Sequence, residues 1–345
     1  MRRRSSDEEL VCRVLEFFPE LGRLKRVEAG GGTAGRNVVF STEKGRFFLR
    51  GRNPKYCTQE EIVYDHSLMR HLSERGVPVP LPIVSSEGKT WLRIDEFIYE
   101  LYEFIEGRPF EPKSVLDLQR VSRALATYHL ATEGFTPEGS KPRAEKREGH
   151  PSKIMPILEE MQRKAKGAAY RTVSYLISQL LAVQERLPDE EYSRLRHLII
   201  HGDFHPANII FGYDGRVYFT DFDWASMQAR AIDISDGMIF FAGRRESEVD
   251  GSNIVSLTQT FEMDLERTKI SLEAYQEEGE LSEDEIEAIP WLLRNRWIQC
   301  RAKGSLKVPE DERLNYLVDK VEGPLHWLDR FEGQLVAELK RIIKG

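Results

Sequence analysis

The first hundred residues contain short runs rich in hydrophobic residues, a pattern typical of β-strands. These runs predict strands at residues 24–27, 38–40, 46–50, 91–94 and 98–101. Two stretches have helical spacing instead, residues 6–18 and 58–76, and each begins with a Ser/Thr-x-x-Glu capping signature. We therefore expect a mainly antiparallel sheet with accompanying helices in the first part of the chain.

Beyond residue 106 the hydrophobic spacing is mainly helical, as at residues 114–129, 153–166 and 169–187. One stretch departs from this pattern. Residues 208–211 are rich in apolar side chains, residues 213–215 (Tyr-Asp-Gly) form a turn signal, and residues 217–219 are apolar again. This order predicts a β-hairpin within an otherwise helical region.

The composition fits a globular protein that can bury a sizeable core. The chain has 345 residues, of which 40% are hydrophobic and 31% charged. This length exceeds one average domain and favours two lobes. The net charge of −7 argues against nucleic acid as a partner and is compatible with a cationic substrate.

The spacing of the cysteines and the absence of long apolar runs indicate in which cellular compartment the protein resides. The three cysteines, Cys12, Cys57 and Cys300, are far apart and have neither metal-binding nor disulfide spacing. No apolar stretch approaches the length of a membrane span, and none follows the basic residues 2–4 as in a signal peptide. We expect a cytoplasmic protein that does not bind membranes.

The predicted hairpin is flanked by residues that could bind a metal ion or take part in catalysis. Asp203 precedes it, Asn208 begins its first strand, and Asp221 follows its second strand. Antiparallel strands would bring Asn208 and Asp221 together, and an amide and a carboxylate oxygen are ligands that suit Mg²⁺ bound to phosphates. A further carboxylate nearby suits a group that accepts a hydroxyl proton. This combination indicates phosphoryl transfer.

A simpler interpretation is a hairpin flanked by unrelated, solvated acids, which is the usual state of any one surface aspartate. The joint spacing of three oxygen-bearing groups, together with His201 and the intervening hairpin, favours kinase chemistry. An acidic run at residues 277–287 leaves a similar choice open. It is either a solvated helix face or a wall that attracts a cationic substrate.

The motifs resemble those of the aminoglycoside phosphotransferase and choline kinase superfamily, small-molecule kinases with a protein-kinase-like fold. The resemblance is carried by His201-Gly202-Asp203, by Asn208 and by Asp221-Phe222-Asp223-Trp224. Gly202 replaces the arginine of the protein-kinase catalytic loop, and Asp223 replaces the glycine of Asp-Phe-Gly. Both departures favour the small-molecule branch over protein kinases.

The resemblance implies an α+β, two-lobed kinase-like fold. Residues 1–103 would form a nucleotide-binding lobe with an antiparallel sheet and a helix. Residues 104–345 would form a mainly helical lobe that carries catalysis and substrate binding. Asp203 would be the catalytic base, and Asn208 and Asp221 would bind Mg²⁺. His201 would brace the loop, and Asp233 would hydrogen-bond the loop backbone.

The resemblance also implies residues for ATP. A glycine-rich loop begins with Gly30, Gly31 and Gly32 between two predicted strands; glycines allow close approach of backbone N–H groups to phosphate, although many hairpins have such loops. Arg50 stands where the family usually has lysine, and its guanidinium would bind phosphate oxygens. Arg52, on the same face of the strand, is a weaker candidate for this role. Asp65 would form an ion pair with Arg50, and Glu61, one helical turn earlier, is the alternative partner.

The remaining expected contacts lie after the small sheet and around the hairpin. The backbone of Glu103 and Ile105 would form hydrogen bonds with adenine, and Ile210 would line the bottom of the adenine pocket. His205 and Asp223 are candidates for contacts with substrate or a second metal ion.

The sequence therefore predicts an ATP- and Mg²⁺-dependent kinase that phosphorylates a hydroxyl of a small metabolite. The capped N-terminal helix, the Phe-Leu-Arg strand at residues 48–50 and the Val-Pro-Val-Pro segment at residues 77–80 resemble the homoserine-kinase-like, choline-kinase-like and spore-coat-associated branches. The resemblance implies an amino alcohol, a homoserine-like compound or a sugar as the acceptor. Two alternatives stay open: an aminoglycoside kinase, and a nucleotide-binding scaffold without turnover, motivated by Arg50. The sequence decides neither ATP against GTP nor the oligomeric state.

Overall fold

The computed structural model describes residues 6–30, 36–53, 57–141, 149–247, 249–250 and 253–344. The chain forms two compact units. The first comprises Met1–Arg108, Thr136–Lys141 and Ile210–Thr220, and the second comprises Pro109–Phe135, Pro142–Ile209 and Asp221–Gly345. The first unit thus continues to Arg108 and includes two further segments. The expected division into lobes 1–103 and 104–345 stays a prediction.

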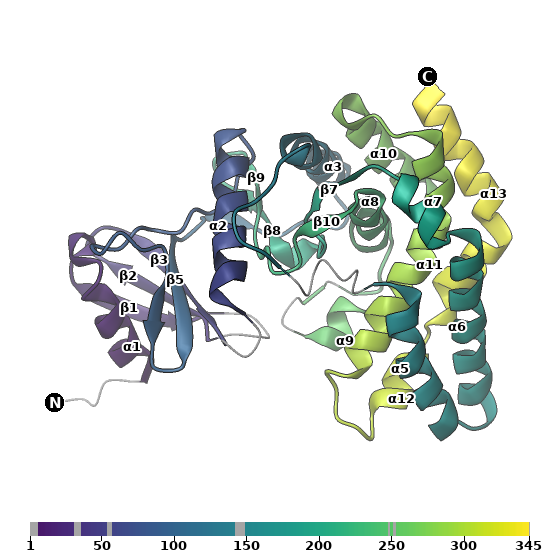
Figure 1. Cartoon of the computed structure of the whole chain (residues 1–345), viewed down its shortest axis with the longest axis horizontal. Coiled ribbons are helices and arrows are strands. Elements are labelled where there is room, and N and C mark those ends of the chain that lie inside the picture. The colour runs from purple at the N-terminus through teal and green to yellow at the C-terminus, as the bar shows by residue number, and fades with distance from the viewer. Residues whose placement is uncertain are drawn as a thin grey trace. The chain divides into compact units, whose positions relative to one another are not determined.

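A five-stranded antiparallel sheet forms the core of the first unit, in the order β1-β2-β3-β5-β4 (Figure 1). The strands are β1 (Leu24–Ala29), β2 (Val38–Thr42), β3 (Arg46–Arg52), β4 (Leu92–Ile94) and β5 (Phe97–Glu103). Each overlaps a strand predicted from a short run rich in hydrophobic residues. The α+β class is confirmed.

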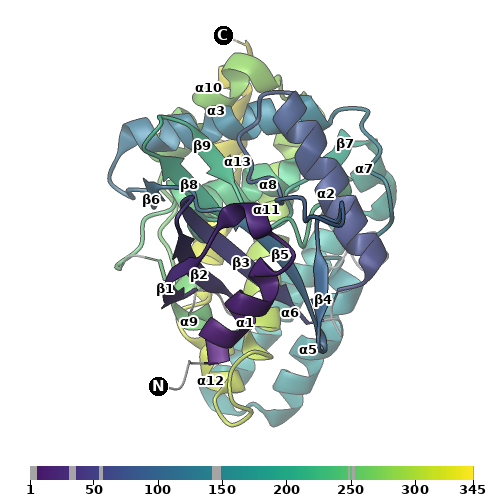
Figure 2. The same cartoon turned by 90° about the vertical axis from the view of Figure 1, so that its left-hand side faces the viewer.

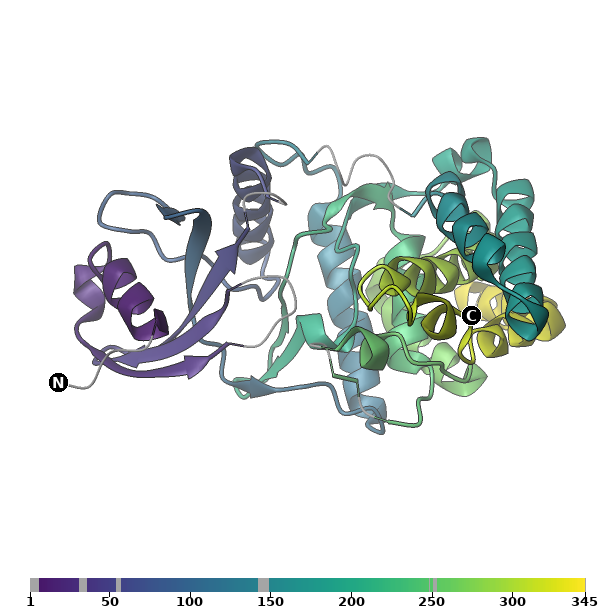
Figure 3. The same ribbon diagram turned by 90° about the horizontal axis from the view of Figure 1, so that it is seen from below.

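Different helices cover the two faces of this sheet. Side-chain alternation along β3 directs Leu49 to one face, where it belongs to a buried cluster with Val11 of α1 (Ser6–Leu15). Figure 2 shows α1 lying across this face. Arg52 points to the other face and contacts α2 (Gln59–Glu74). Figure 3 shows α1 and α2 on the two sides of the sheet.

The predicted hairpin is confirmed and extends a small second sheet in the order β6-β8-β9. The strands are β6 (Gly107–Arg108), β8 (Ile209–Gly212) and β9 (Val217–Phe219). At the turn, the Gly212 N–H donates to the Arg216 carbonyl at 2.9 Å, and Gly215 has a φ of +83°. A left-handed residue is what a tight turn of this kind requires, which explains a glycine there.

The second unit is mainly helical, as predicted. Its helices are α3 (Val115–Thr132), α5 (Pro151–Lys164), α6 (Gly167–Arg186), α7 (Asp189–Arg194), α8 (Ala231–Gly237), α9 (Ile254–Leu257), α10 (Leu265–Gly279), α11 (Glu283–Ser305), α12 (Arg313–Val318) and α13 (Glu322–Lys344). Helix α3 packs along α10, and α5 packs along α6. No helix in the described part of the chain is both long and apolar enough to cross a membrane.

Helix α11 is the central helix of this unit, in contact with α5, α6, α8, α12 and α13. Arg294, Arg296 and Arg301 are buried together with most other positions of the helix. A helix surrounded by neighbours buries all its faces, so its charged side chains need internal partners.

Candidate functional site

A two-stranded sheet positions the predicted catalytic loop, residues 201–208. Strands β7 (His197–Ile200) and β10 (Ser226–Ala229) are antiparallel, with Ile200 opposite Ser226. The loop that begins at His201 and the segment that ends at Ala225 therefore adjoin the same end of this sheet. Gly202 has a φ of +76°, and a Cβ on it would lie 2.4 Å from the Trp224 carbonyl oxygen. Only glycine fits this close approach, which explains its presence where protein kinases have arginine.

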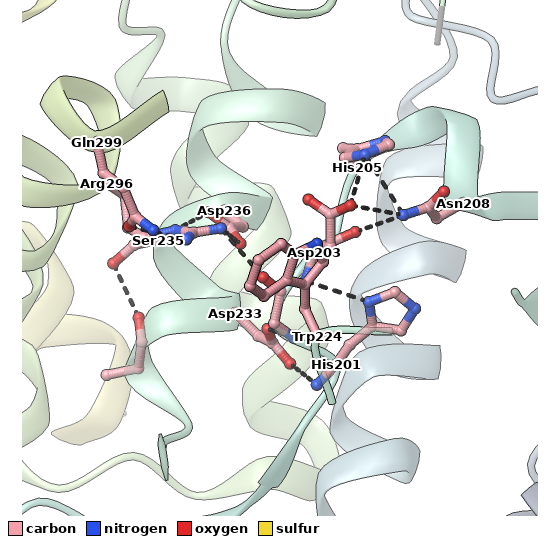
Figure 4. A network of polar contacts seen from close by, with 12 residues as sticks. His201, Asp203, His205, Asn208, Trp224, Asp233, Ser235, Asp236, Arg296 and Gln299 are labelled. Atoms are coloured by element: carbon pink, nitrogen blue, oxygen red, sulfur yellow. Dashed lines mark hydrogen bonds and ion pairs between the residues drawn. The ribbon is translucent and has the colours of Figure 1, made fainter. Parts of the chain in front are cut away.

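The carboxylate of Asp233 on α8 fixes the backbone of this loop (Figure 4). It accepts hydrogen bonds from the N–H groups of His201, at 2.7 Å, and Gly202, at 2.9 Å. His129 Nε2 lies 3.2 Å from the same carboxylate. Burial favours a neutral Asp233, but the hydrogen bonds from His129 and Gly202 and the nearby histidines outweigh it and lower its pKa. The predicted architectural role of Asp233 is confirmed.

Asp203 lies on this loop between two partners from the same segment. Its Oδ2 is 3.2 Å from His205 Nε2, and Asn208 Nδ2 donates to the Asp203 carbonyl at 2.9 Å and to Oδ2 at 3.2 Å (Figure 4). The His205 side chain is buried, whereas 35% of the Asp203 side chain is exposed. His205 and Asn208 thus fix the carboxylate, and its exposed part remains accessible to a ligand.

The Asp203–His205 contact is an ion pair. Burial acts to raise the pKa of Asp203, but the charge and hydrogen bond of His205, with Arg296 further away, hold that pKa well below its usual range. Burial likewise acts to lower the pKa of His205, but Asp203 and Asp221 raise it overall. Both shifts favour the charged forms of the pair, and Asp203 is a weak base.

The predicted metal ligands have His205 as a shared neighbour. Asn208 Nδ2 lies 3.3 Å from His205 Nε2, and Asp221 is close enough to raise the pKa of His205. Asp221 has a φ of +63°, a backbone conformation that non-glycine residues adopt rarely and most often at functional sites. The Asn208 amide nitrogen faces Asp203, which directs its Oδ1 the other way.

This donor set fits one type of metal site. The described residues contain no group of three or more His, Cys, Asp and Glu side chains that could hold a metal ion alone. One amide and one carboxylate oxygen fit Mg²⁺ that takes its remaining ligands from phosphates and water. Asp223, the second acid of this segment, is half-buried two residues beyond Asp221.

The first unit holds the residues predicted to bind nucleotide. The Gly30 N–H donates to the Asn37 carbonyl at 3.1 Å, and a Cβ on Gly30 would lie 2.5 Å from the Asn37 carbonyl carbon, so glycine is required there. Gly31 and Gly32 lie outside the described residues, and their phosphate role stays a prediction.

The partner of Asp65 is Arg52, which the sequence analysis ranked below Arg50. Arg52 Nη1 donates to Asp65 Oδ2 at 2.7 Å, and its Nε donates to Glu100 Oε2 at 2.5 Å. The reason is that β3 is two residues longer than predicted, so Arg52 still lies within the sheet, opposite Ile98. Arg50 is half-buried, and its nucleotide role stays a prediction.

Glu61, the alternative partner predicted for the strand arginine, caps the start of its own helix. Its carboxylate accepts a hydrogen bond from the Thr58 N–H at 2.7 Å, and Thr58 Oγ1 accepts one from the Glu61 N–H at 3.2 Å. The pair is the capping box predicted for the start of α2.

A buried ionic cluster, comprising Arg52, Asp65, His66, Glu100 and Lys141, surrounds this contact. The Lys141 ammonium contacts Asp65, and His66 Nε2 lies 2.6 Å from Glu100 Oε1. Burial acts to raise the pKa of Glu100, but Arg52 and His66 outweigh it, so the pKa lies well below the ordinary range. Lys141 was missed because its loop has no periodic pattern from which a buried position could be predicted.

The backbone expected to bind adenine follows directly from β5. The Phe104 N–H donates to the Arg46 carbonyl at 3.0 Å, so alternation directs the peptide groups of Glu103 and Ile105 away from β3. Ile210 of β8 lies against the backbone of Gly107, where a Cβ would be only 2.6 Å from its Cγ2. These orientations are compatible with the predicted adenine contacts.

Sequence reasoning missed a second brace of the catalytic loop. Arg296 of α11 binds Asp236 through Nε, at 2.7 Å, and Nη2, at 2.5 Å, and Nη2 also lies 3.3 Å from the Gly202 carbonyl (Figure 4). Burial raises the pKa of Asp236 to about 7 even with Arg296 opposing it. The carboxyl therefore depends on Arg296 to remain ionised. The signal available in the sequence was three arginines within one long helix.

The acidic run at residues 277–287 is paired with basic residues of its own unit. Glu277 binds Arg123, Glu285 binds the buried Arg230, and Glu287 binds Lys340. These pairs compensate much of the negative charge and favour a structural role over a wall for a cationic substrate.

Replacing Arg52 should destabilise the first unit. We expect Arg52→Met to lower the free energy of unfolding by about 3 kcal/mol or more, because Asp65 and Glu100 lose their shared buried cation. Arg46→Met is the matched control on the same strand, since its pairs with Glu28 and Glu106 are exposed and worth about 1 kcal/mol at most. Urea unfolding measures both. Equal losses in the two variants would contradict the structural role of Arg52.

Removing Arg296 should leave a buried acid without its partner. We expect Arg296→Met to lower the free energy of unfolding by about 3–5 kcal/mol. Adding Asp236→Leu should restore at least half of that loss, because an apolar pair replaces an uncompensated charge. Urea unfolding of both single variants and the double variant gives the coupling energy. Purely additive losses would show that the pair does not act as a unit.

Comparison with known proteins agrees with this geometry. The family described as "Phosphotransferase enzyme family" matches residues 25–257, more than half of the chain. A homoserine kinase from Rhizobium meliloti (strain 1021) is 26% identical over 290 residues, which cover 84% of this chain and 81% of that protein. A homoserine kinase from Parvibaculum lavamentivorans is 27% identical over 294 residues, covering 84% and 82%.

Solved structures show the same fold. A microcompartment-associated aminopropanol kinase superposes with a TM-score of 0.70 at 14% identity, covering 95% of this chain and 99% of the other. A choline kinase from Cryptosporidium parvum gives 0.65 at 15% identity, covering 98% and 99%. The fold is therefore that of the small-molecule kinases. With its family match and its catalytic loop, the chain belongs to the phosphotransferase enzyme family.

Proposed function

We propose that this protein is an ATP- and Mg²⁺-dependent kinase that transfers the γ-phosphate to a hydroxyl of a small metabolite. The arrangement that carries the proposal is an ionised, partly exposed Asp203 with Asn208 hydrogen-bonded to it and with Asp221 near their shared neighbour His205. This is the set of groups that phosphoryl transfer requires: a carboxylate for the acceptor hydroxyl and oxygen ligands for a phosphate-bound cation.

The roles follow from the chemistry of each group. Asn208 and Asp221 would hold Mg²⁺, which when bound neutralises charge on phosphate oxygens. Asp203 would orient the acceptor hydroxyl toward the γ-phosphorus. As the new P–O bond forms and the bond to ADP breaks, the hydroxyl proton passes to Asp203.

The low basicity of Asp203 agrees with this role. Phosphoryl transfer through a loose transition state needs little proton removal before the bond to the leaving group is broken. A carboxylate with a depressed pKa therefore serves mainly to position the hydroxyl and takes the proton late. His205 keeps this carboxylate ionised and Asn208 fixes its rotamer.

Residues of the first unit would bind the nucleotide. Gly30 and its loop would approach the phosphates, the Arg50 guanidinium would bind phosphate oxygens, and the peptide groups of Glu103 and Ile105 would recognise adenine above Ile210. Support comes from the required glycine at position 30 and from the orientation of the peptide groups after β5. The buried cluster around Arg52 would hold this sheet and α2 in place.

The acceptor is proposed to be a small metabolite with a hydroxyl group. The sequence relatives are homoserine kinases, whereas the structural neighbours include aminopropanol, choline and aminoglycoside kinases. A nucleotide-binding scaffold without turnover is the alternative that the following experiment decides.

The test is acceptor-dependent ADP formation with Mg-ATP, over a panel of L-homoserine, amino alcohols, aldoses and an aminoglycoside. At least one acceptor should be phosphorylated, and EDTA should abolish the reaction. Asp203→Ala should lose at least about 10²-fold in kcat because it removes the group that positions and deprotonates the hydroxyl, while ATP still binds in calorimetry.

Asp189→Ala is the control, since this exposed aspartate pairs with His150 away from the catalytic loop. Full activity of Asp203→Ala would contradict the role assigned to Asp203. ATP binding by the wild-type protein without turnover of any acceptor would support the scaffold.

A further inference from the structure

A guanidinium group in the second unit lacks the partner that its burial calls for. The Nε and Nη2 atoms of Arg245 are shut off from solvent and have no hydrogen-bond partner among the residues that the structure describes. Its Nη1 makes a long hydrogen bond of 3.4 Å to the Phe240 carbonyl. The residue as a whole is only half-buried, so its charged end is directed inward.

The local fold places this group between two aromatic rings. A bridge between Arg244 and Glu262 fixes the backbone next to Arg245 and Phe261, and the π-helix Met238–Ala242 supplies Phe240. The Arg245 guanidinium carbon lies 5.3 Å from the centroid of each of the two rings. Such contacts stabilise a cation but leave its N–H donors unsatisfied.

Other buried arginines of this unit differ from Arg245. Arg230 binds Glu285, Arg294 binds Glu332, and Arg296 binds Asp236. Arg301 binds no acid and its Nε has no partner in the described residues, but its two other nitrogen atoms donate to three backbone carbonyls. Burial lowers the pKa of Arg245 only to about 10, so it remains a cation at neutral pH. A buried, charged group with unused donors is unfavourable unless a ligand supplies the opposite charge.

Phe240 connects Arg245 to the loop that carries Asp203. The ring of Phe240, which contacts Arg245, also contacts the His205 ring at a centroid distance of 5.7 Å, and His205 binds Asp203. Cys300 on α11 interacts electrostatically with both Asp203 and Arg245. His205 Nδ1 is a second buried atom here without a partner in the described residues.

We propose that Arg245 binds the carboxylate of the acceptor while the acceptor hydroxyl lies at Asp203. The planar guanidinium has two adjacent N–H directions unused, which is the donor geometry that a carboxylate takes. This inference rests on the proposed kinase function and narrows its substrate class. The acceptor is a hydroxy acid or a hydroxyl-bearing amino acid, and amino alcohols, choline and aminoglycosides are poor substrates because they leave Arg245 unpaired.

Acceptor pairs that differ by one carboxylate test this inference. They are L-homoserine with 3-aminopropan-1-ol, L-serine with ethanolamine, and glycerate with ethylene glycol. For the pair that is phosphorylated, kcat/KM of the wild-type protein should be at least about 10²-fold higher with the carboxylate present. In Arg245→Met this preference should fall to within about threefold, with little change for the decarboxylated member.

Binding without turnover separates this inference from the kinase proposal. In a thermal shift assay without nucleotide, saturating carboxylate members should raise the wild-type Tm by about 2–4 °C, and their decarboxylated partners should not. Arg245→Met should lose this shift while its own Tm is unchanged or higher. Arg245→Lys should keep part of the shift. Arg244→Met is the matched control, since the Arg244 side chain is exposed and pairs with Asp264.

The outcomes are distinct. A carboxylate-specific shift that depends on Arg245 but comes without phosphorylation supports the subsite and contradicts the kinase. Phosphorylation with no preference for the carboxylate, or a preference that Arg245→Met retains, overturns the subsite and leaves the kinase standing. A lower Tm of Arg245→Met together with an unchanged acceptor preference assigns Arg245 to packing and also overturns the subsite.

Discussion

The ion pair between Asp203 and His205 is the interaction on which the proposed chemistry depends. The two groups keep each other charged, and Asn208 binds the same carboxylate. A carboxylate ionised in this way cannot be a strong base, so it suits a reaction in which positioning and charge neutralisation supply most of the rate. The pair also explains why His205, which the sequence offered as a substrate contact, is buried behind the loop.

The surrounding structure fixes the loop that carries this pair. Asp233 binds its backbone N–H groups, and Arg296 lies near the Gly202 carbonyl while it neutralises Asp236. Both braces are buried and charged, so disturbing either would leave an unsatisfied group in the interior. A loop held by such contacts keeps its geometry without a ligand, which lowers the reorganisation that catalysis requires.

Most buried charges among the described residues of each unit have well-defined partners, whereas Arg245 has two buried nitrogen atoms without a hydrogen-bond partner. In the first unit, Arg52, Lys141 and His66 surround Asp65 and Glu100. In the second, the guanidinium of Arg245 has aromatic neighbours but, among the described residues, no acid that binds it. Proteins retain an unfavourable feature of this kind where function uses it, which is why the acceptor is the partner proposed for it.

Local patterns predicted much of this molecule. Short hydrophobic runs predicted the strands, and a capping box predicted the start of α2. Two apolar runs on either side of the turn at residues 213–215 predicted the hairpin. The extent of a strand is less certain than its existence, and a two-residue extension of β3 made Arg52 the partner of Asp65. Three other features depend on tertiary packing, which the spacing of residues along the sequence does not reveal. They are the burial of α11, the Arg296–Asp236 pair and the buried nitrogen atoms of Arg245 that have no partner among the described residues.

The central claim is that Asp203 is held ionised by a protonated His205. A titration followed by nuclear magnetic resonance, with carbon-labelled aspartate and nitrogen-labelled histidine, tests it directly, and His205→Gln assigns the coupling. The Asp203 carboxyl should remain ionised at pH values near 4, where ordinary aspartates are half protonated, and His205 should remain protonated above the ordinary histidine value of about 6.5. Titration of Asp203 together with the exposed aspartates, unchanged in His205→Gln, would contradict the account.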